Sequence, residues 1–338
     1  MGNTSRGIVS LRSLLRLSTV AALGALHVTS GCGSSSDSTF DGGASDGSVG
    51  DGASSGDSAL PDGFSFGDSS AADGGCQAPD MLVVLDRTLS MSAEPNGTMP
   101  PNTPAGHALS KWVLATSAVK LITNPPADQT IRYGLELFPL DPAQVDAGAG
   151  NGKCVTLTQE LGTTHANNKA CQPGQLLFPP AVGNGAAIAA TLDPEVETLC
   201  VTTPIASALD TARSVLAPLA SPTRKQFVLL VTDGGETCSG NASIGIAQQL
   251  AASGVQTFVV GFGAAGAGGG VNVPLLNNVA CAGMTAKGFA TACVKGDGGG
   301  YIAAAPNGAP LFLAAQDGPA LEAALKGIAG SICCGCAR

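Results

Sequence analysis

The stretch Leu82-Val83-Val84-Leu85-Asp86-Arg87-Thr88-Leu89-Ser90-Met91-Ser92 decides the fold. Four consecutive apolar residues, Leu82 to Leu85, predict a strand that is buried on both faces, because a half-exposed strand would alternate with polar residues. Asp86 ends this strand, and hydroxyl side chains follow at Thr88 and Ser90. Ligands of open α/β sheets bind beyond the carboxyl ends of the strands, and oxygen ligands suit hard divalent cations such as Mg2+. The stretch therefore predicts a central strand followed by one loop of a cation site.

The chain from Cys76 onward alternates between strand and helix patterns. Strands are predicted at 81–86, 130–138, 226–232, 255–262 and 301–305, and helices at 105–123, 204–219, 243–253, 273–281 and 319–331. Proline-rich 93–104 is predicted as a loop, and 139–200 as a cysteine-containing insertion with one or two short strands. The alternation predicts an α/β fold with a doubly wound, mainly parallel sheet and helices on both faces.

Two further loops offer oxygen ligands in the same setting. Thr203 precedes Pro204 and is predicted as the N-cap of the next helix. Asp233 directly follows the second long apolar strand and precedes two glycines. Because parallel strands of one sheet end at a shared edge, we expect the three loops to converge there.

The combination resembles the von Willebrand factor type A (vWA) domain and its metal-ion-dependent adhesion site. The matching pieces are D-R-T-L-S at 86–90, T-P at 203–204 and V-T-D-G at 231–234, and the resemblance covers about residues 77 to 332. It implies that Thr88, Ser90 and Thr203 offer hydroxyl oxygens to Mg2+, with Mn2+ or Ca2+ as alternatives. Asp86 and Asp233 would act largely through bound water or hydrogen bonds. A carboxylate of a protein ligand would complete the ion's shell, so the resemblance implies a binding module, not an enzyme.

Two positions depart from the family pattern. Leu89 stands where the family commonly has glycine, and Thr88 stands where it commonly has serine. Leu89 could crowd the loop or narrow the access of a partner, and Thr202 could replace Thr203 as a ligand. A vWA-like structural or interaction module whose site binds no metal is therefore the alternative.

The N-terminal region predicts export. Three arginines precede the apolar run Leu17 to Val28, and Thr29-Ser30-Gly31-Cys32 resembles a bacterial lipoprotein box. We expect residues 1–31 to be a signal peptide and Cys32 to be lipidated, with an ordinary signal peptide as the alternative. Segment 33–75 holds eight aspartates and no lysine or arginine, which predicts a disordered tether after Cys32. The protein is thus expected at the cell envelope, as an outer-membrane or surface lipoprotein, or else secreted.

An exported chain is expected to form disulfides. Ten cysteines remain after Cys32, which allows five disulfides: Cys76, Cys154, Cys171, Cys200, Cys238, Cys281, Cys293, Cys333, Cys334 and Cys336. We expect Cys76 to pair with one of the last three, and Cys281 with Cys293. Cys154–Cys171 and Cys200–Cys238 are the other predicted pairs. A metal cluster at 333–336 is the alternative for the C-terminal cysteines.

Rival functions have weaker patterns. The formal net charge of −9 argues against nucleic-acid binding, which needs clustered basic residues. Gly261 to Gly266 matches GxGxxG, but more glycine follows where a dinucleotide site needs a helix. A metal-dependent hydrolase lacks an HExxH motif, and His107 is expected to be solvated; the only other histidine of the mature chain is His165.

Overall fold

The computed structural model describes residues 77–101, 103–140, 155–156, 171–192, 198–200, 202–266 and 270–332. The predicted signal peptide, the lipidated Cys32 and the tether lie outside these residues. So do Cys76, Cys154, His165 and the cysteines at 333, 334 and 336, and predictions about them stay predictions.

A six-stranded sheet forms the centre of the fold, with the strand order β10-β7-β6-β1-β2-β4. The strands are β1 (Asp80–Asp86), β2 (Arg132–Phe138), β4 (Gln175–Ala181), β6 (Gln226–Thr232), β7 (Val255–Phe262) and β10 (Leu313–Ala315). Neighbouring strands are parallel except β2 and β4, which pair antiparallel. The predicted mainly parallel α/β sheet is confirmed.

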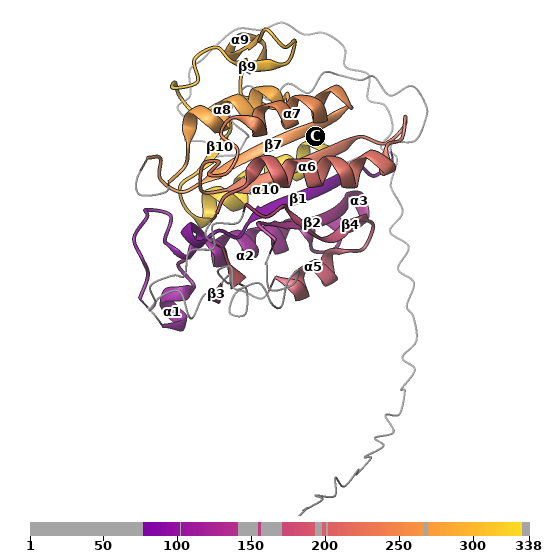
Figure 1. Cartoon of the computed structure of the whole chain (residues 1–338). Helices are drawn as coiled ribbons and strands as arrows, with labels where there is room; N and C mark the ends of the chain where they lie inside the picture. The colour runs from indigo at the N-terminus through magenta and orange to yellow at the C-terminus, as the bar shows by residue number, and fades with distance from the viewer. Residues whose placement is uncertain are drawn as a thin grey trace, which may run out of the picture. The chain divides into compact units, whose positions relative to one another are not determined.

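Both faces of the sheet are covered by helices, as Figure 1 shows for α2 and α6 on opposite sides of β1. Met81, Val83 and Leu85 pack on one side, and Leu82 and Val84 on the other, since side chains alternate along a strand. The first side is covered by α2 (Lys111–Thr123), α5 (Gly185–Thr191) and α10 (Gly318–Ile332). The second is covered by α6 (Ile205–Leu216), α7 (Ala242–Ala252) and α8 (Val273–Ala282). Burial on both faces explains the unbroken apolar run of β1.

The helix predicted at 105–123 is interrupted. A short helix α1 (Pro104–His107) ends first, and α2 begins at Lys111. The Ser110 hydroxyl accepts a hydrogen bond from the Val113 N–H at 3.2 Å, which caps the new helix. The Lys111 N–H donates to the Ala93 carbonyl at 2.8 Å, outside the helix. A helical pattern of apolar residues does not reveal such a cap.

Segment 139–200 contributes more than the predicted short strands. It supplies β4 at the edge of the main sheet, helix α5, and a small antiparallel pair of β3 (Val155–Thr156) with β5 (Thr198–Leu199). β4 contains Pro179 and Pro180, which an edge strand tolerates because one side of its backbone is unpaired.

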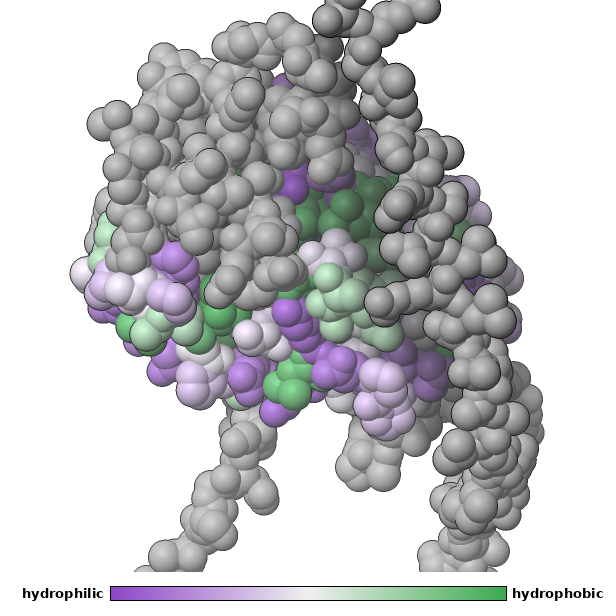
Figure 2. All heavy atoms as spheres, turned by 90° about the horizontal axis from the view of Figure 1, so that it is seen from below, coloured by the Kyte–Doolittle hydropathy of each residue, from purple (hydrophilic) through white to green (hydrophobic). Residues whose placement is uncertain are grey.

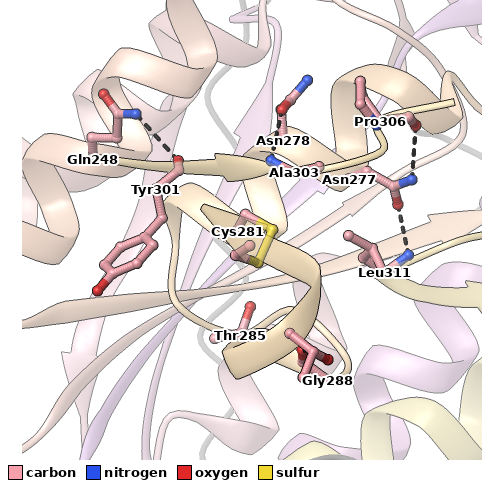
Figure 3. The surroundings of a disulfide bond; sticks show 12 residues. Gln248, Asn277, Asn278, Cys281, Thr285, Gly288, Tyr301, Ala303, Pro306 and Leu311 are labelled. Atoms are coloured by element: carbon pink, nitrogen blue, oxygen red, sulfur yellow. Dashed lines mark hydrogen bonds between the residues drawn. A yellow bond between two sulfur atoms is a disulfide. The ribbon is translucent and has the colours of Figure 1, made fainter. Parts of the chain in front are cut away.

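The region after α8 forms a separate hairpin. β9 (Tyr301–Ala303) pairs with β8 (Cys293–Lys295) outside the main sheet, after the short helix α9 (Phe289–Ala292). The predicted Cys281–Cys293 disulfide is confirmed and joins this hairpin to α8 (Figure 3). Asn278 of α8 accepts from the Ala303 N–H at 3.0 Å, and Asn277 donates to the Pro306 carbonyl at 2.9 Å. The hairpin is thus held to α8 by a disulfide and by side-chain hydrogen bonds.

The remaining elements are short: the 3-10 helices η1 (Leu89–Ser92) and η3 (Ala217–Leu219), and helix α3 (Ala127–Thr130). Among the described residues, none of the helices is long and apolar enough to cross a membrane. Figure 2 shows hydrophilic and hydrophobic residues interspersed over the described part of one face, as on the water-facing side of a domain.

Candidate metal centre at the carboxyl edge of the sheet

The candidate site lies where the strand order reverses. The chain passes from β1 to β2 on one side, and later returns to β6 on the other side of β1. In open α/β sheets, the connections that leave the two strands at such a switch point run to opposite faces of the sheet, and a crevice for a ligand remains between them. Asp86 is the last residue of β1 and Asp233 follows β6 directly. The topology therefore brings the two predicted carboxylates to the same edge.

Asp86 is fully buried and both of its oxygens are hydrogen-bonded. Oδ1 accepts from the Thr88 N–H at 2.7 Å, which fixes the turn after β1, and Oδ2 accepts from the Thr232 hydroxyl at 2.6 Å. Burial, together with the negative charge of Asp233, raises the pKa of Asp86 to about 7. A nearby positive charge would stabilise the ionised form of this buried carboxyl group.

The predicted hydroxyl ligands lie side by side. Thr88 Oγ1 and Ser90 Oγ are 2.9 Å apart, and Ser90 Oγ donates to Asp233 Oδ1 at 2.8 Å. The first and third predicted loops are therefore in direct contact. Leu89, between the two hydroxyls, packs its side chain against the α2 side of the core. The core therefore accommodates the leucine side chain at the position where the vWA pattern commonly has glycine.

The second loop is joined to both others through the backbone. The Leu89 N–H donates to the Cys200 carbonyl at 2.7 Å. The Thr203 N–H donates to the Thr237 hydroxyl at 2.7 Å, and the Thr237 N–H returns a bond to the Thr203 carbonyl at 3.1 Å. Thr203 is buried at this junction. All three predicted loops therefore converge at one edge.

The predicted role of Thr203 as N-cap is wrong. Pro204 occupies the N-cap position of α6, and the Ala206 N–H donates to Glu236 Oε2 at 2.7 Å. The other oxygen of Glu236 accepts from the Cys238 N–H at 2.7 Å. A carboxylate from the Asp233 loop thus caps α6, which a local sequence pattern cannot show.

Cys171 is bonded to Cys238, so the predicted pairs Cys154–Cys171 and Cys200–Cys238 are both wrong. Because β4 is antiparallel to β2, its first residues lie at the carboxyl edge, where Gln175 faces Leu137. Cys171 lies just before β4 and can therefore reach the Asp233 loop. Cys200 is also disulfide-bonded.

Peptide mapping without reduction tests this pairing. We expect one disulfide-linked pair of peptides that contains Cys171 and Cys238, and another that contains Cys281 and Cys293, because both bonds join residues that the fold brings together. A reduced and alkylated sample is the control. A peptide that joins Cys238 to Cys200 would contradict the structure of the loop.

The sequence prediction missed a lysine at the site. Lys111 Nζ lies 2.5 Å from Asp233 Oδ2, and the two side chains are 5% and 0% exposed. Burial raises the pKa of Asp233, while Lys111 and the hydrogen bond from Ser90 lower it. One signal was available: Lys111 starts a helix, where the helix dipole disfavours positive charge.

The chain has the predicted doubly wound, mainly parallel α/β fold. No protein-family model and no curated protein matches it. Similar solved structures include a von Willebrand factor type A structure from Catenulispora acidiphila, with 11% identity, 76% of this chain and 43% of that chain covered, and a TM-score of 0.45. The pilus adhesin SpaC from Lactobacillus rhamnosus GG has 12% identity, coverages of 76% and 30%, and a TM-score of 0.45. Proximal thread matrix protein 1 from the mussel byssus, with a zinc-occupied metal-ion-dependent adhesion site, has 14% identity, coverages of 76% and 48%, and a TM-score of 0.42. In each of these three, the match spans less than half of that chain.

The donor set of the candidate site fits a small hard cation. Adjacent ligands of an octahedral Mg2+ at about 2.1 Å are about 3 Å apart, and the Thr88 and Ser90 oxygens are 2.9 Å apart. Within the described residues, no group of three or more His, Cys, Asp or Glu gathers anywhere. The donors that the described residues offer at this edge are therefore hydroxyls and two carboxylates, in contrast to the thiolate and imidazole sets that soft metals prefer.

Two rival patterns are placed elsewhere. After Gly261 to Gly266, the next helix starts only at Val273, and a side chain at Gly261 would collide with the Phe312 ring. Gly261 therefore lies within β7 at a position where the packing leaves no room for a side chain. His107, which was expected to be solvated, is instead buried at the end of α1.

Proposed function

We propose that the protein is an exported, surface-presented binding module that binds a protein ligand through a divalent cation at this edge. Thr88, Ser90 and Thr203 would hold Mg2+, Mn2+ or Ca2+ directly, and Asp86 and Asp233 would act through water or hydrogen bonds. The single observation that carries the proposal is the continuous contact from Thr88 to Ser90 to Asp233, at 2.9 and 2.8 Å.

The chain's own residues prepare such a site before a cation binds. Asp86 fixes the Thr88 backbone and the Thr232 hydroxyl, and so holds the turn from which Thr88 and Ser90 project. Both Asp86 oxygens have partners within the protein. A bound divalent cation with so few direct anionic ligands would stay electrophilic and could accept a carboxylate from the partner.

The setting of the site favours binding over chemistry. Two exposed apolar side chains, Met99 and Leu109, lie on the segment that follows the first ligand loop and could contact a protein partner. The tether and the lipidated Cys32 would present the domain away from the membrane surface. The proposed module binds its partner and catalyses no reaction.

The alternative is a vWA-like interaction module that works without metal. The observation that favours it is the buried Lys111, whose ammonium already faces Asp233. In this case, the same edge would bind its partner through a preformed set of hydroxyls and charges.

Calorimetric titration with Mg2+ and Mn2+ separates the two. We expect saturable binding to the wild type and a loss of at least about tenfold in affinity in Ser90→Ala, because one direct ligand is removed. Ser92→Ala is the matched control, since its hydroxyl donates to the Leu89 carbonyl within η1 and not to the site. Well-folded wild-type protein that releases no heat with either ion would favour the metal-free alternative.

A further inference from the structure

We propose that Lys111 is a tethered cation of the site: its ammonium neutralises Asp233 when no metal ion is bound, and it lowers the affinity of the site for divalent ions. The inference rests on the proposed metal site and adds a residue that the vWA-like motif does not contain.

The position of Lys111 is unfavourable without Asp233. A lysine whose side chain is 5% exposed has lost most of its hydration, and a positive charge at a helix N-terminus opposes the helix dipole. Asp233, at the end of β6, has no exposed surface and would be equally unfavourable alone. Each charge therefore needs the other, and their contact fixes the start of α2 to the end of β6.

The neighbouring backbone makes room for the lysine. Gly263, just after β7, has φ +115°, a backbone conformation that residues other than glycine rarely adopt. A Cβ atom at this residue would lie 3.3 Å from Lys111 Cδ and 3.7 Å from Nζ. The lysine side chain thus lies between Asp233 and a residue without a side chain.

The charges of the cluster explain the effect on a metal ion. Lys111 places one positive charge against one oxygen of Asp233, and the other oxygen of Asp233 accepts a hydrogen bond from Ser90. A divalent ion bound next to Ser90 would lie several ångströms from the Lys111 ammonium. At that separation and at the dielectric constant of water, the repulsion corresponds to about a tenfold loss in affinity.

The test compares wild type, Lys111→Met and Lys111→Gln, with Mn2+ alone as the probe. We expect both variants to bind Mn2+ at least about tenfold more tightly than the wild type. In EDTA, we expect them to melt at a lower temperature, and saturating Mn2+ should raise their melting temperature more than that of the wild type. Lys111→Gln keeps a donor for Asp233 and provides a folded variant where methionine does not fold. Lys120→Met, in the last turn of α2, is the matched control and should change neither quantity.

The outcomes separate this inference from the proposed function. Binding by the variants but not by the wild type would support the tethered cation and overturn a metal-dependent function. Binding by the wild type, with equal or weaker binding by both variants, would support the metal site and overturn the role of Lys111. If none of the three proteins binds Mn2+, both are overturned.

Discussion

Replacing Asp233 with alanine is expected to lower the free energy of unfolding by about 3 to 5 kcal/mol in EDTA, the range for removing one partner of a buried ion pair. The variant would leave the Lys111 ammonium buried without its carboxylate and would remove the acceptor of the Ser90 hydroxyl. Urea denaturation followed by circular dichroism measures the change. The same substitution should abolish any binding of Mn2+.

The loss in the free energy of unfolding is expected to be large because the ion pair is buried, and two control variants test this dependence on burial. Asp210 and Arg213 form an ion pair on α6 with side chains 50% and 41% exposed, so Asp210→Ala should cost less than about 1 kcal/mol. The double variant Asp233→Ala/Lys111→Met removes both charges and should be more stable than Asp233→Ala alone. A loss in Asp233→Ala as small as that in Asp210→Ala would contradict the buried pair.

The central strands could be predicted because burial on both faces requires an unbroken run of apolar residues. β6 and β7 have the predicted bounds, and β1 begins one residue earlier than predicted. A parallel strand between two helical layers must be apolar on both faces, and few other elements produce such runs. The carboxylates that end these strands could then be placed at one edge without knowledge of any contact.

Other parts of the site depend on contacts between distant segments, which local patterns do not show. The direction of β4 decides that Cys171 reaches Cys238, and nothing within β4 indicates that it runs antiparallel. Glu236 caps a helix that begins 31 positions before it in the chain. Lys111 belongs to α2 but pairs with the loop after β6. Each of these side chains takes its role from the fold.

A buried glutamate on β2 gives the second large effect. Glu136 has no exposed surface, and neither of its carboxyl oxygens has a hydrogen-bond partner among the described residues. Gly174 lies against the carboxyl group and leaves no room for a side chain at position 174. Burial raises the pKa of Glu136 well above its ordinary value of 4.5. The folded protein therefore holds a proton that the unfolded chain releases.

This difference fixes the sign of the pH dependence. Between the ordinary pKa of 4.5 and the raised folded pKa of Glu136, the folded state binds more protons, so stability falls as pH rises, by up to about 1.4 kcal/mol per pH unit. Glu136→Gln removes this term, because glutamine resembles the protonated acid and does not titrate. We expect the variant and the wild type to be similarly stable near pH 4.5, and the variant to be increasingly more stable toward pH 8.

Urea denaturation at half-unit steps of pH gives the free energy of unfolding of both proteins as a function of pH. The difference between the two curves cancels the contributions of the titrating groups that both proteins share. Glu322→Gln on α10 is the matched control, since the Glu322 side chain is 43% exposed and its replacement should leave a nearly constant difference. A Glu136→Gln curve that runs parallel to the wild type from pH 4.5 to 8 would show that Glu136 is ionised in the folded protein. In that case, a positive charge or a solvent path must reach β2 beneath α6, and the packing of this face of the sheet would have to be revised.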